Sequence, residues 1–273
     1  MRFLSTLLVL ISFSILGCDI QWSGSSSKPK RVLRLATTTS TRDSGLLDKL
    51  LPSFEAANQC HITVIAVGTG AALKLGERGE VDVLIVHAPE AEAVFMNDGH
   101  GQHHQPFMEN YFMLLGPSSD PADIRDKSPA VALEAIAPDF TFISRGDDSG
   151  THKKEINLWN QMGGVPQYPR YYETGQAMAN TLMIAEEKQA YVLTDRATYL
   201  RFKSKLSLIP LVTEDPLLRN RYSVITVTPE KNDMINGYLA EQLAAYLVTE
   251  TALRAISDYR IDNEPLFTPL TQK

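Results

Sequence analysis

Short apolar runs alternate with amphipathic stretches from residue 31 onward. The segments 31–36, 60–67 and 81–86 are apolar and of a length typical of buried strands. Between them, the leucines and phenylalanine of 46–54 and the residues of 71–78 have helical spacing. The order strand, helix, strand, helix, strand predicts a parallel sheet with right-handed crossovers.

Two later apolar segments, 111–117 and 222–229, have similar lengths, and both end at a proline. We interpret them as adjacent strands that carry the chain out of a first lobe and back into it. The intervening residues repeat the strand and helix pattern, and the helices expected at 235–247 and 251–259 complete the first lobe. The predicted fold class is therefore α/β with two lobes: residues 31–117 plus 221–273 form lobe 1, and residues 118–220 form lobe 2.

Three turns rich in hydroxyl and glycine residues each follow a predicted strand. They are Thr37-Thr38-Thr39-Ser40, Gly68-Thr69-Gly70, and the segment 144–152, which carries Arg145 and precedes a predicted helix. A helix N-terminus presents free amides and a positive dipole end, and ligands of open α/β sheets bind at the carboxyl ends of strands. The three turns predict a site for a small anion. Taken alone, the third turn is equally consistent with an ordinary N-cap at Asp148 or Ser149.

Histidines raise the question of a metal site. His100, His103 and His104 lie in a glycine-punctuated stretch without Cys or acidic residues at suitable spacing, so we interpret it as a surface loop and predict no metal. His87 ends the third predicted strand beside the proposed site. The sequence leaves open whether His87 lines that site or packs next to it.

The segment Gly146–Gly150 resembles the nucleophile elbow of hydrolases, but its serine, Ser149, stands one position late. His152 follows too closely to act naturally as a base for Ser149. We therefore expect a protein that is not an enzyme, and we keep a periplasmic serine hydrolase as an alternative.

Composition restricts the possible partners. The chain has 273 residues, of which 44% are hydrophobic and 21% charged, and its formal net charge is −6. An acidic chain is a poor partner for nucleic acid, whose backbone demands clustered Lys and Arg. An anion site in this protein must act locally, through donors aimed at the ligand.

The N-terminus is typical of a processing signal. Residues 1–17 have the basic start and apolar core of a signal peptide, and Ile15-Leu16-Gly17-Cys18 looks like a lipobox, after which Cys18 is acylated. Residues 18–30 form a polar, flexible tether. Asp19 resembles the signal that retains lipoproteins at the inner membrane, so we expect a protein anchored through Cys18 at the periplasmic face of the bacterial inner membrane. The alternative is a plain secretory leader with an incidental cysteine. Cys60 is expected to be a buried small hydrophobe.

Long strings of the sequence resemble a known family, the tungstate-binding proteins of ABC importers (TupA). The resemblance rests on Leu35–Ser40, Val67–Gly70, Val86–Glu92, Ser144–Glu155, Glu173–Gln176 and Leu193–Arg196. It implies a type II periplasmic-binding-protein fold, with two crossover strands and a ligand cleft between the lobes. It also implies tungstate as ligand with molybdate bound more weakly, and an ABC permease and ATPase as partners. We expect a monomer and no cofactor.

The resemblance also implies which residues bind the ligand. Lobe 1 would contribute Thr38, Thr39, Ser40 and Thr69, and lobe 2 would contribute Ser144, Arg145, Ser149, Gly150 and Thr151, with Arg145 as the charge partner. A tetrahedral oxyanion without a proton requires donors only, and charge-assisted hydrogen bonds are about twice as strong as neutral ones. Asp147 and Asp148 are expected to cap the helix or to pair with Arg145. Another tetrahedral oxyanion, namely molybdate, sulfate or phosphate, remains the alternative ligand.

Overall fold

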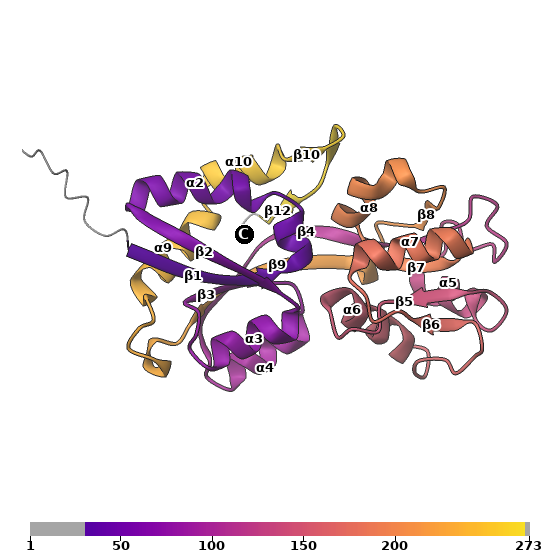
Figure 1. Cartoon of the computed structure of the whole chain (residues 1–273), viewed down its shortest axis with the longest axis horizontal. Helices are drawn as coiled ribbons and strands as arrows, with labels where there is room; N and C mark the ends of the chain where they lie inside the picture. Colours follow the sequence, from indigo (N-terminus) through magenta and orange to yellow (C-terminus); the bar gives the residue numbers. More distant parts are fainter. Residues whose placement is uncertain (1–30, 271–273) are drawn as a thin grey trace, which may run out of the picture. The chain divides into compact units, whose positions relative to one another are not determined.

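The computed structural model describes residues 31–270 (Figure 1). The predicted signal peptide, Cys18 and the tether lie outside the described residues. A mixed sheet runs through the described part of the chain in the order β2-β1-β3-β9-β4-β7-β5-β6. We call β1, β2 and β3 with their helices the first half, and β5, β6 and β7 with their helices the second half.

The first half confirms the predicted parallel unit. β1 (Arg31–Thr38) pairs in parallel with β2 (Cys60–Val67) and with β3 (Val83–Val86). Residues of β1 alternate between two cores. Leu33 and Leu35 pack with α2 (Leu47–Asn58), α9 (Gly237–Leu247) and α10 (Glu250–Ser257). Ala36 packs on the other face with α3 (Thr69–Glu77) and α4 (Pro89–Asn97). Cys60 is fully buried, as predicted.

The second half repeats this plan. β5 (Phe142–Ser144) lies in parallel between β6 (Tyr171–Glu173) and β7 (Tyr191–Asp195). One face is covered by α7 (Met178–Lys188) and α8 (Arg196–Phe202), whose apolar residues pack with Ile143 and Val192. The other face is covered by α5 (Pro129–Ile136) and α6 (Gly150–Asn160), which pack with Phe142 and Leu193. Figure 1 shows these helices around β5 and β7.

Two long strands link the halves. β4 (Gly101–Gly116) pairs antiparallel with β9 (Arg219–Val227) from Gly101 opposite Val227 to Tyr111 opposite Arg219, and from Phe112 onward it pairs with β7. The strands that contain segments 111–117 and 222–229 are adjacent, as predicted, but the two segments are offset along them: residues 222–227 pair with residues 101–108 of β4, whereas residues 112–116 pair with β7 and β8. The lobe boundaries that we drew from the sequence stay a prediction, because one core cluster continues along β4 through both halves.

One prediction in this region is wrong. Residues 101–105 form the start of β4 and not a surface loop, because they pair with residues 224–227 of β9. His104 then reaches the buried Glu92, with 2.9 Å between Nε2 and Oε2. No group of three or more His, Cys, Asp or Glu within residues 31–270 is arranged to hold a metal ion.

The remaining elements are short. They are α1 (Thr39–Asp43), β8 (Ile209–Val212), which pairs with β4, the 3₁₀ helices η1 (Lys203–Lys205), η2 (Pro216–Leu218) and η3 (Pro229–Lys231), and the strands β10 (Arg260–Ile261), β11 (Glu264–Pro265) and β12 (Thr268–Pro269). Across the described residues, we find no helix with the length and apolar character needed to cross a bilayer.

Candidate anion-binding site

A cavity of about 260 Å³ lies at the carboxyl ends of β1, β2, β3 and β5. Its volume is below the range of about 300–1,000 Å³ that is typical for drug-sized ligands, so it suits a small ion. Its lining comes from both halves: Thr38, Thr39, Ser40, Val67, Gly68, Thr69 and His87 from the first, and Arg145, Asp147, Ser149, Gly150, Thr151 and Ala177 from the second. Eight of the nine predicted ligand-binding residues are among them; Ser144 is not.

Helix starts converge on this cavity. The helices α3, α6 and α7 begin there, and the short α1 begins at Thr38. The N-cap residues of α3 and α7, Gly68 and Ala177, make no side-chain hydrogen bond to their helices. The first N–H groups of a helix have no partner inside the helix, so amides of these first turns are available to a ligand. The positive ends of the helix dipoles favour an anion.

Thr69 supplies a buried donor without an internal partner. Its side chain is fully buried, and within the described residues its Oγ1 has no hydrogen-bond partner. Leaving a buried hydroxyl unpaired costs about 1–3 kcal/mol. Because Thr69 lines the cavity, a bound anion would satisfy this hydroxyl.

Thr38 has a different role. Its Oγ1 accepts from the Thr41 N–H at 3.2 Å and so caps α1, and it lies 2.6 Å from Thr41 Oγ1 and 3.3 Å from His87 Nε2. The Thr38 hydroxyl is therefore engaged within the protein. Its contribution to the cavity is to fix the start of α1, where Thr39 and Ser40 are partly exposed.

Arg145 brings a nearly buried positive charge into the cavity, with an exposed fraction of 7%. Its Nη2 donates to Asp147 Oδ2 at 2.5 Å, and its Nε donates to the Gln176 carbonyl at 3.3 Å. Asp147 Oδ1 accepts from the Ser149 N–H at 3.2 Å. Asp147 thus pairs with Arg145, as predicted, and also accepts from the N–H of Ser149, the N-cap residue of α6, so each of its oxygens already accepts one hydrogen bond. Within the described residues, Arg145 Nη1 has no partner.

The first residues of α6 allow this helix to lie close to the His87 ring. Ser149 is its N-cap and accepts from the His152 N–H at 3.3 Å. A Cβ atom on Gly150 would lie 2.7 Å from His87 Cε1, so only glycine allows the helix start to lie against that ring. Thr151 is 3% exposed and lines the cavity beside it.

Two residues of the same turn lie outside the cavity lining. Ser144 is fully buried, and its hydroxyl, which has no hydrogen-bond partner among the described residues, is near Glu155 and Tyr171. Side chains alternate along a strand, so Ser144 and Arg145 point to opposite sides at the end of β5. Asp148 is exposed and pairs with Lys153 at 2.5 Å. The structure therefore does not place the hydroxyl of Ser144 in the cavity.

Comparison with known proteins identifies the family. A sequence profile of the PBP superfamily domain matches residues 24–251. The tungstate-binding protein TupA of Peptoclostridium acidaminophilum is 41% identical to this chain, with 98% of this chain and 97% of that protein covered. The chain belongs to the TupA family.

Solved structures of the family agree with the fold. The tungstate binding protein TupA from Desulfovibrio alaskensis G20 superposes with a TM-score of 0.81 at 40% identity, covering 89% of this chain and 100% of that one. The tungstate ABC transporter structure from Geobacter sulfurreducens gives a TM-score of 0.76 at 47% identity, covering 84% and 98%. These matches confirm the predicted type II periplasmic-binding-protein fold. They also place this TupA-family chain among binding proteins, not enzymes.

The geometry around Ser149 agrees with membership of a binding-protein family. Within the described residues, no histidine ring is hydrogen-bonded to Ser149 Oγ, and His152 Nδ1 instead accepts from the Asp148 N–H at 3.0 Å. Ser149 therefore lacks the base that a hydrolytic nucleophile requires.

His87 lines the cavity, which answers the question that the sequence left open. It is 6% exposed, and its ring stacks on Tyr222 with 4.7 Å between centroids. Burial lowers the pKa of His87 and is the largest influence; Asp195, Asn220 and Glu92 oppose it, and the Arg145 charge lowers the pKa by the smallest amount. The ring is therefore neutral at neutral pH.

A buried acid supports the second half behind Arg145. Glu155 is 2% exposed, and its Oε1 accepts from Tyr171 Oη at 2.6 Å and from Trp159 Nε1 at 3.3 Å. Burial raises the pKa of Glu155 to about 7, although these hydrogen bonds oppose the rise. Near neutral pH this side chain is partly protonated.

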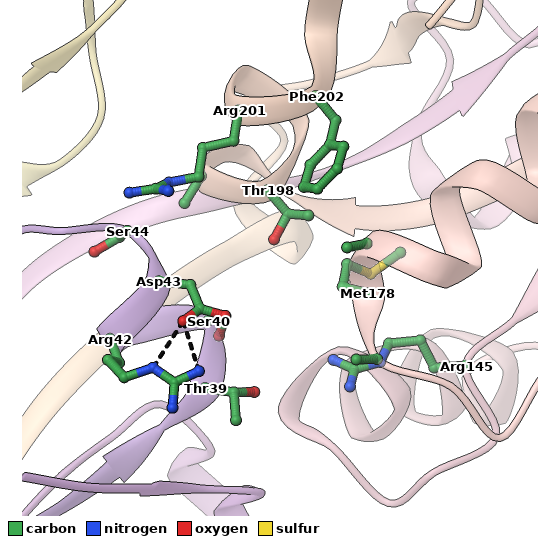
Figure 2. A pocket seen from close by; sticks show the side chains of 13 residues that line it. Thr39, Ser40, Arg42, Asp43, Ser44, Arg145, Met178, Thr198, Arg201 and Phe202 are labelled. Carbon is green, nitrogen blue, oxygen red and sulfur yellow. Dashed lines mark hydrogen bonds and ion pairs between the residues drawn. The ribbon is translucent and has the colours of Figure 1, made fainter. Parts of the chain in front are cut away.

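A second cavity of about 190 Å³ adjoins the first and shares Thr39, Ser40, Arg145 and Ala177 with it. Figure 2 shows Arg145 of the second half opposite Thr39 and Ser40 of the first, with Arg42 on the same side as Thr39 and Ser40 and with Arg201 in the upper part of the view. Arg42 pairs with Asp43, whereas Arg201 forms no ion pair with any described residue. The guanidinium of Arg201, without an ion-pair partner among the described residues, therefore lines the same cavity as Arg145.

Sequence reasoning missed the contribution of α7. Residues 171–173 form β6, and the turn that follows it brings Ala177 and the start of α7 to the cavity. The string Glu173–Gln176, which carried part of the family resemblance, was the sequence feature that could have indicated a role for this turn in the site.

Proposed function

We propose that this protein captures tungstate outside the cytoplasm and delivers it to the permease and ATPase of an ABC importer. Family membership supports this proposal, because relatives that cover nearly the whole chain are tungstate-binding proteins. The single observation that carries it is the meeting of helix starts, the unpaired Thr69 hydroxyl and the Arg145 guanidinium around one small cavity.

The chemistry of the lining supports an oxyanion that carries no proton. Tungstate presents four acceptor oxygens and no hydrogen at neutral pH, so it pairs with amides, hydroxyls and a guanidinium. The carboxylate in the lining, Asp147, is already bonded to Arg145 and to the Ser149 N–H. A dianion would compete with Asp147 for Arg145, whereas a neutral ligand has no charge with which to do so.

We propose that the direct donors are Thr39, Ser40 and Thr69 from the first half and Arg145, Ser149, Gly150 and Thr151 from the second. Thr38 would act mainly by capping α1, and Ser144 by supporting β5 from behind. Tungstate and molybdate are nearly equal in size, so we expect molybdate as a weaker ligand of the same site. Sulfate is smaller, and a cavity shaped for tungstate would hold it with longer hydrogen bonds.

We further propose that the chain is a monomeric lipoprotein. The segment Ile15–Cys18 supports acylation at Cys18, and the polar residues up to 30 supply the tether. Asp19 supports retention at the periplasmic face of the inner membrane. Mass spectrometry of membrane-extracted protein would detect the acylated Cys18, whereas an unmodified chain released to the periplasm would contradict the anchor.

A thermal-shift panel tests the ligand. The purified protein is heated with tungstate, molybdate, chromate, sulfate or phosphate in a buffer free of other oxyanions. We expect the largest stabilisation with tungstate, because a ligand at a thousandfold excess over its Kd adds about 4 kcal/mol to the folded state. A larger shift with sulfate or phosphate would support the alternative oxyanion, and no shift with tungstate would contradict the proposal.

A further inference from the structure

Among the side chains of the cavity lining, His87 is the one whose ordinary pKa lies nearest to neutral pH, so its ring can gain a proton when its surroundings change. It follows β3, is 6% exposed, and faces the start of α6, where a Cβ on Gly150 would meet its Cε1 at 2.7 Å. The ring therefore lies between the two halves, beside the place where their donors converge.

The tautomer of His87 is fixed by a chain of buried amides. Asn220 Nδ2 donates to Asn110 Oδ1 at 2.8 Å and to Tyr222 Oη at 3.0 Å, which leaves Asn220 Oδ1 facing His87 Nδ1 at 2.8 Å. An amide oxygen only accepts, so Nδ1 carries the hydrogen. In the neutral ring Nε2 then holds a lone pair, and it lies 3.3 Å from Thr38 Oγ1.

A lone pair on Nε2 is unfavourable beside an anion. It repels an oxyanion oxygen, whereas a protonated Nε2 donates to that oxygen and adds a positive charge. In the ligand-free cavity the opposite holds, because burial and Arg145 both disfavour the charged ring. A dianion therefore changes which form of His87 is stable.

The surroundings of the ring supply charges of both signs. Glu92 of α4 and Asp195 at the end of β7 favour the protonated ring, and Arg145 opposes it. A further cavity of about 50 Å³ is lined by His87 together with Glu90, Lys153, Lys154, Arg219 and Arg221. The nearby Tyr222 hydroxyl stays uncharged, because burial raises its pKa. The two neighbouring carboxylates and the negative charge of a bound anion together oppose the effect of burial and so favour a cationic ring.

We propose that His87 is a proton-linked anion-binding residue: when a tetrahedral dianion enters the cavity, Nε2 takes up one proton from solvent and donates a hydrogen bond to the anion. No covalent bond of the ligand forms or breaks. This role rests on the proposed oxyanion function, and it makes anion binding and proton binding mutually reinforcing. Affinity then rises by up to about tenfold for each unit that the pH falls, between the His87 pKa values of the free and bound states.

Proton uptake can be measured directly. Sodium tungstate and sodium molybdate are titrated calorimetrically into the full-length protein from pH 5.5 to 8, in two oxyanion-free buffers with different ionisation enthalpies. We expect the binding heats to differ between buffers by an amount that corresponds to net uptake of up to one proton per anion, at pH values between the His87 pKa of the free protein and that of the complex. The affinity rises in parallel as the pH falls.

Variants test whether the proton is taken up by His87 and not by the anion itself. His87→Gln should bind with lower affinity that no longer varies with pH and with no proton uptake, whereas His103→Gln, which alters an exposed histidine, should behave as wild type. If His87→Gln does not fold, the buffer comparison on the wild-type protein alone decides.

The outcomes distinguish two failures. Anion binding with equal heats in both buffers and an affinity that does not vary with pH overturns the role of His87 and leaves the proposed function standing. No binding of tungstate at any pH overturns the proposed function, and the role of His87 with it.

Discussion

Among the described residues that line the cavity, those of the first half are uncharged at neutral pH, whereas the second half contributes Arg145 and Asp147. The first half offers hydroxyls, amides and a neutral imidazole; some are held by local bonds, such as the cap at Thr38, whereas the Thr69 hydroxyl has no partner among the described residues. The second half offers one guanidinium with a carboxylate already attached. The difference leads us to propose that the charge of the second half attracts any oxyanion, whereas the neutral donors of both halves discriminate by size.

The largest expected effect comes from removing the charge. Arg145→Ala should weaken binding of tungstate and molybdate alike, by about 3 kcal/mol or more, which is a hundredfold or greater in Kd. Part of the loss arises because Asp147 is left without its partner and repels the anion. Isothermal titration calorimetry measures this loss, and Arg254→Gln, at an exposed arginine paired with Glu250, serves as the control. Wild-type affinity in Arg145→Ala would show that the second half does not supply the attraction.

Thr69→Val tests the contribution of the uncharged donors of the first half to anion binding. A hydrogen bond to a charged group contributes about 1.5–3 kcal/mol, so affinity should fall by about tenfold to a hundredfold. The melting temperature of the ligand-free protein should not fall, because the lost hydroxyl has no internal partner.

Thr37→Val is the matched control for Thr69→Val. Thr37 is also fully buried, but its hydroxyl donates to the Ile85 carbonyl at 2.8 Å and it does not line the cavity. This change should lower stability by about 1 kcal/mol or more and leave the Kd unchanged. If the two variants behave alike, Thr69 is a structural residue and not a ligand donor.

The free energy of unfolding should depend on pH through Glu155, a buried acid of the second half. Its pKa of about 7 lies above the ordinary value of 4.5, so the folded state holds a proton that the unfolded chain has released. The stabilisation from that proton is fully present below about pH 4.5 and is lost as the pH rises through 7. Glu155→Gln should remove this loss, which is on the order of 2 kcal/mol. Urea unfolding at pH 5 and pH 8 measures it, and an unchanged pH dependence would contradict a protonated Glu155.

The smallest expected effect is the loss of anion affinity when a glycine of the cavity lining is replaced by alanine. We compare Gly150 of the second half with Gly68 of the first half. Gly150→Ala adds a methyl group 2.7 Å from His87 Cε1, so the start of α6 must shift and anion affinity should fall by about tenfold, or about 1.4 kcal/mol. Gly68→Ala adds a methyl group where no atom lies within 4 Å, and it should weaken binding less. Equal losses in the two variants would show that contact between His87 and α6 is unimportant for binding.

The sequence predicted the parts of the site that depend on local pattern. A strand that ends in hydroxyl or glycine residues before a helix places donors at one edge of a parallel sheet, and this argument located Thr39, Thr69 and Arg145 in one cavity. It did not locate Ser144, because the alternation of side chains at a strand end depends on where the strand stops. That end is defined only by the pairing of β5 with β6.

Other features depend on contacts between distant segments. The tautomer of His87 follows from Asn220, which is 133 residues away along the chain. The start of β4 at Gly101 follows from pairing with β9, and a glycine-rich and histidine-rich segment shows no strand period of its own. Such features depend on tertiary neighbours, which override local propensity.

Anomalous diffraction from crystals grown with tungstate tests the central claim most directly, because the tungsten atom is located without reference to the protein. The account predicts one strong peak in the cavity, with anion oxygens within hydrogen-bonding distance of Thr69 Oγ1 from the first half and an Arg145 nitrogen from the second. A peak outside this cavity, or an ion bound by the residues of one half alone, would contradict it.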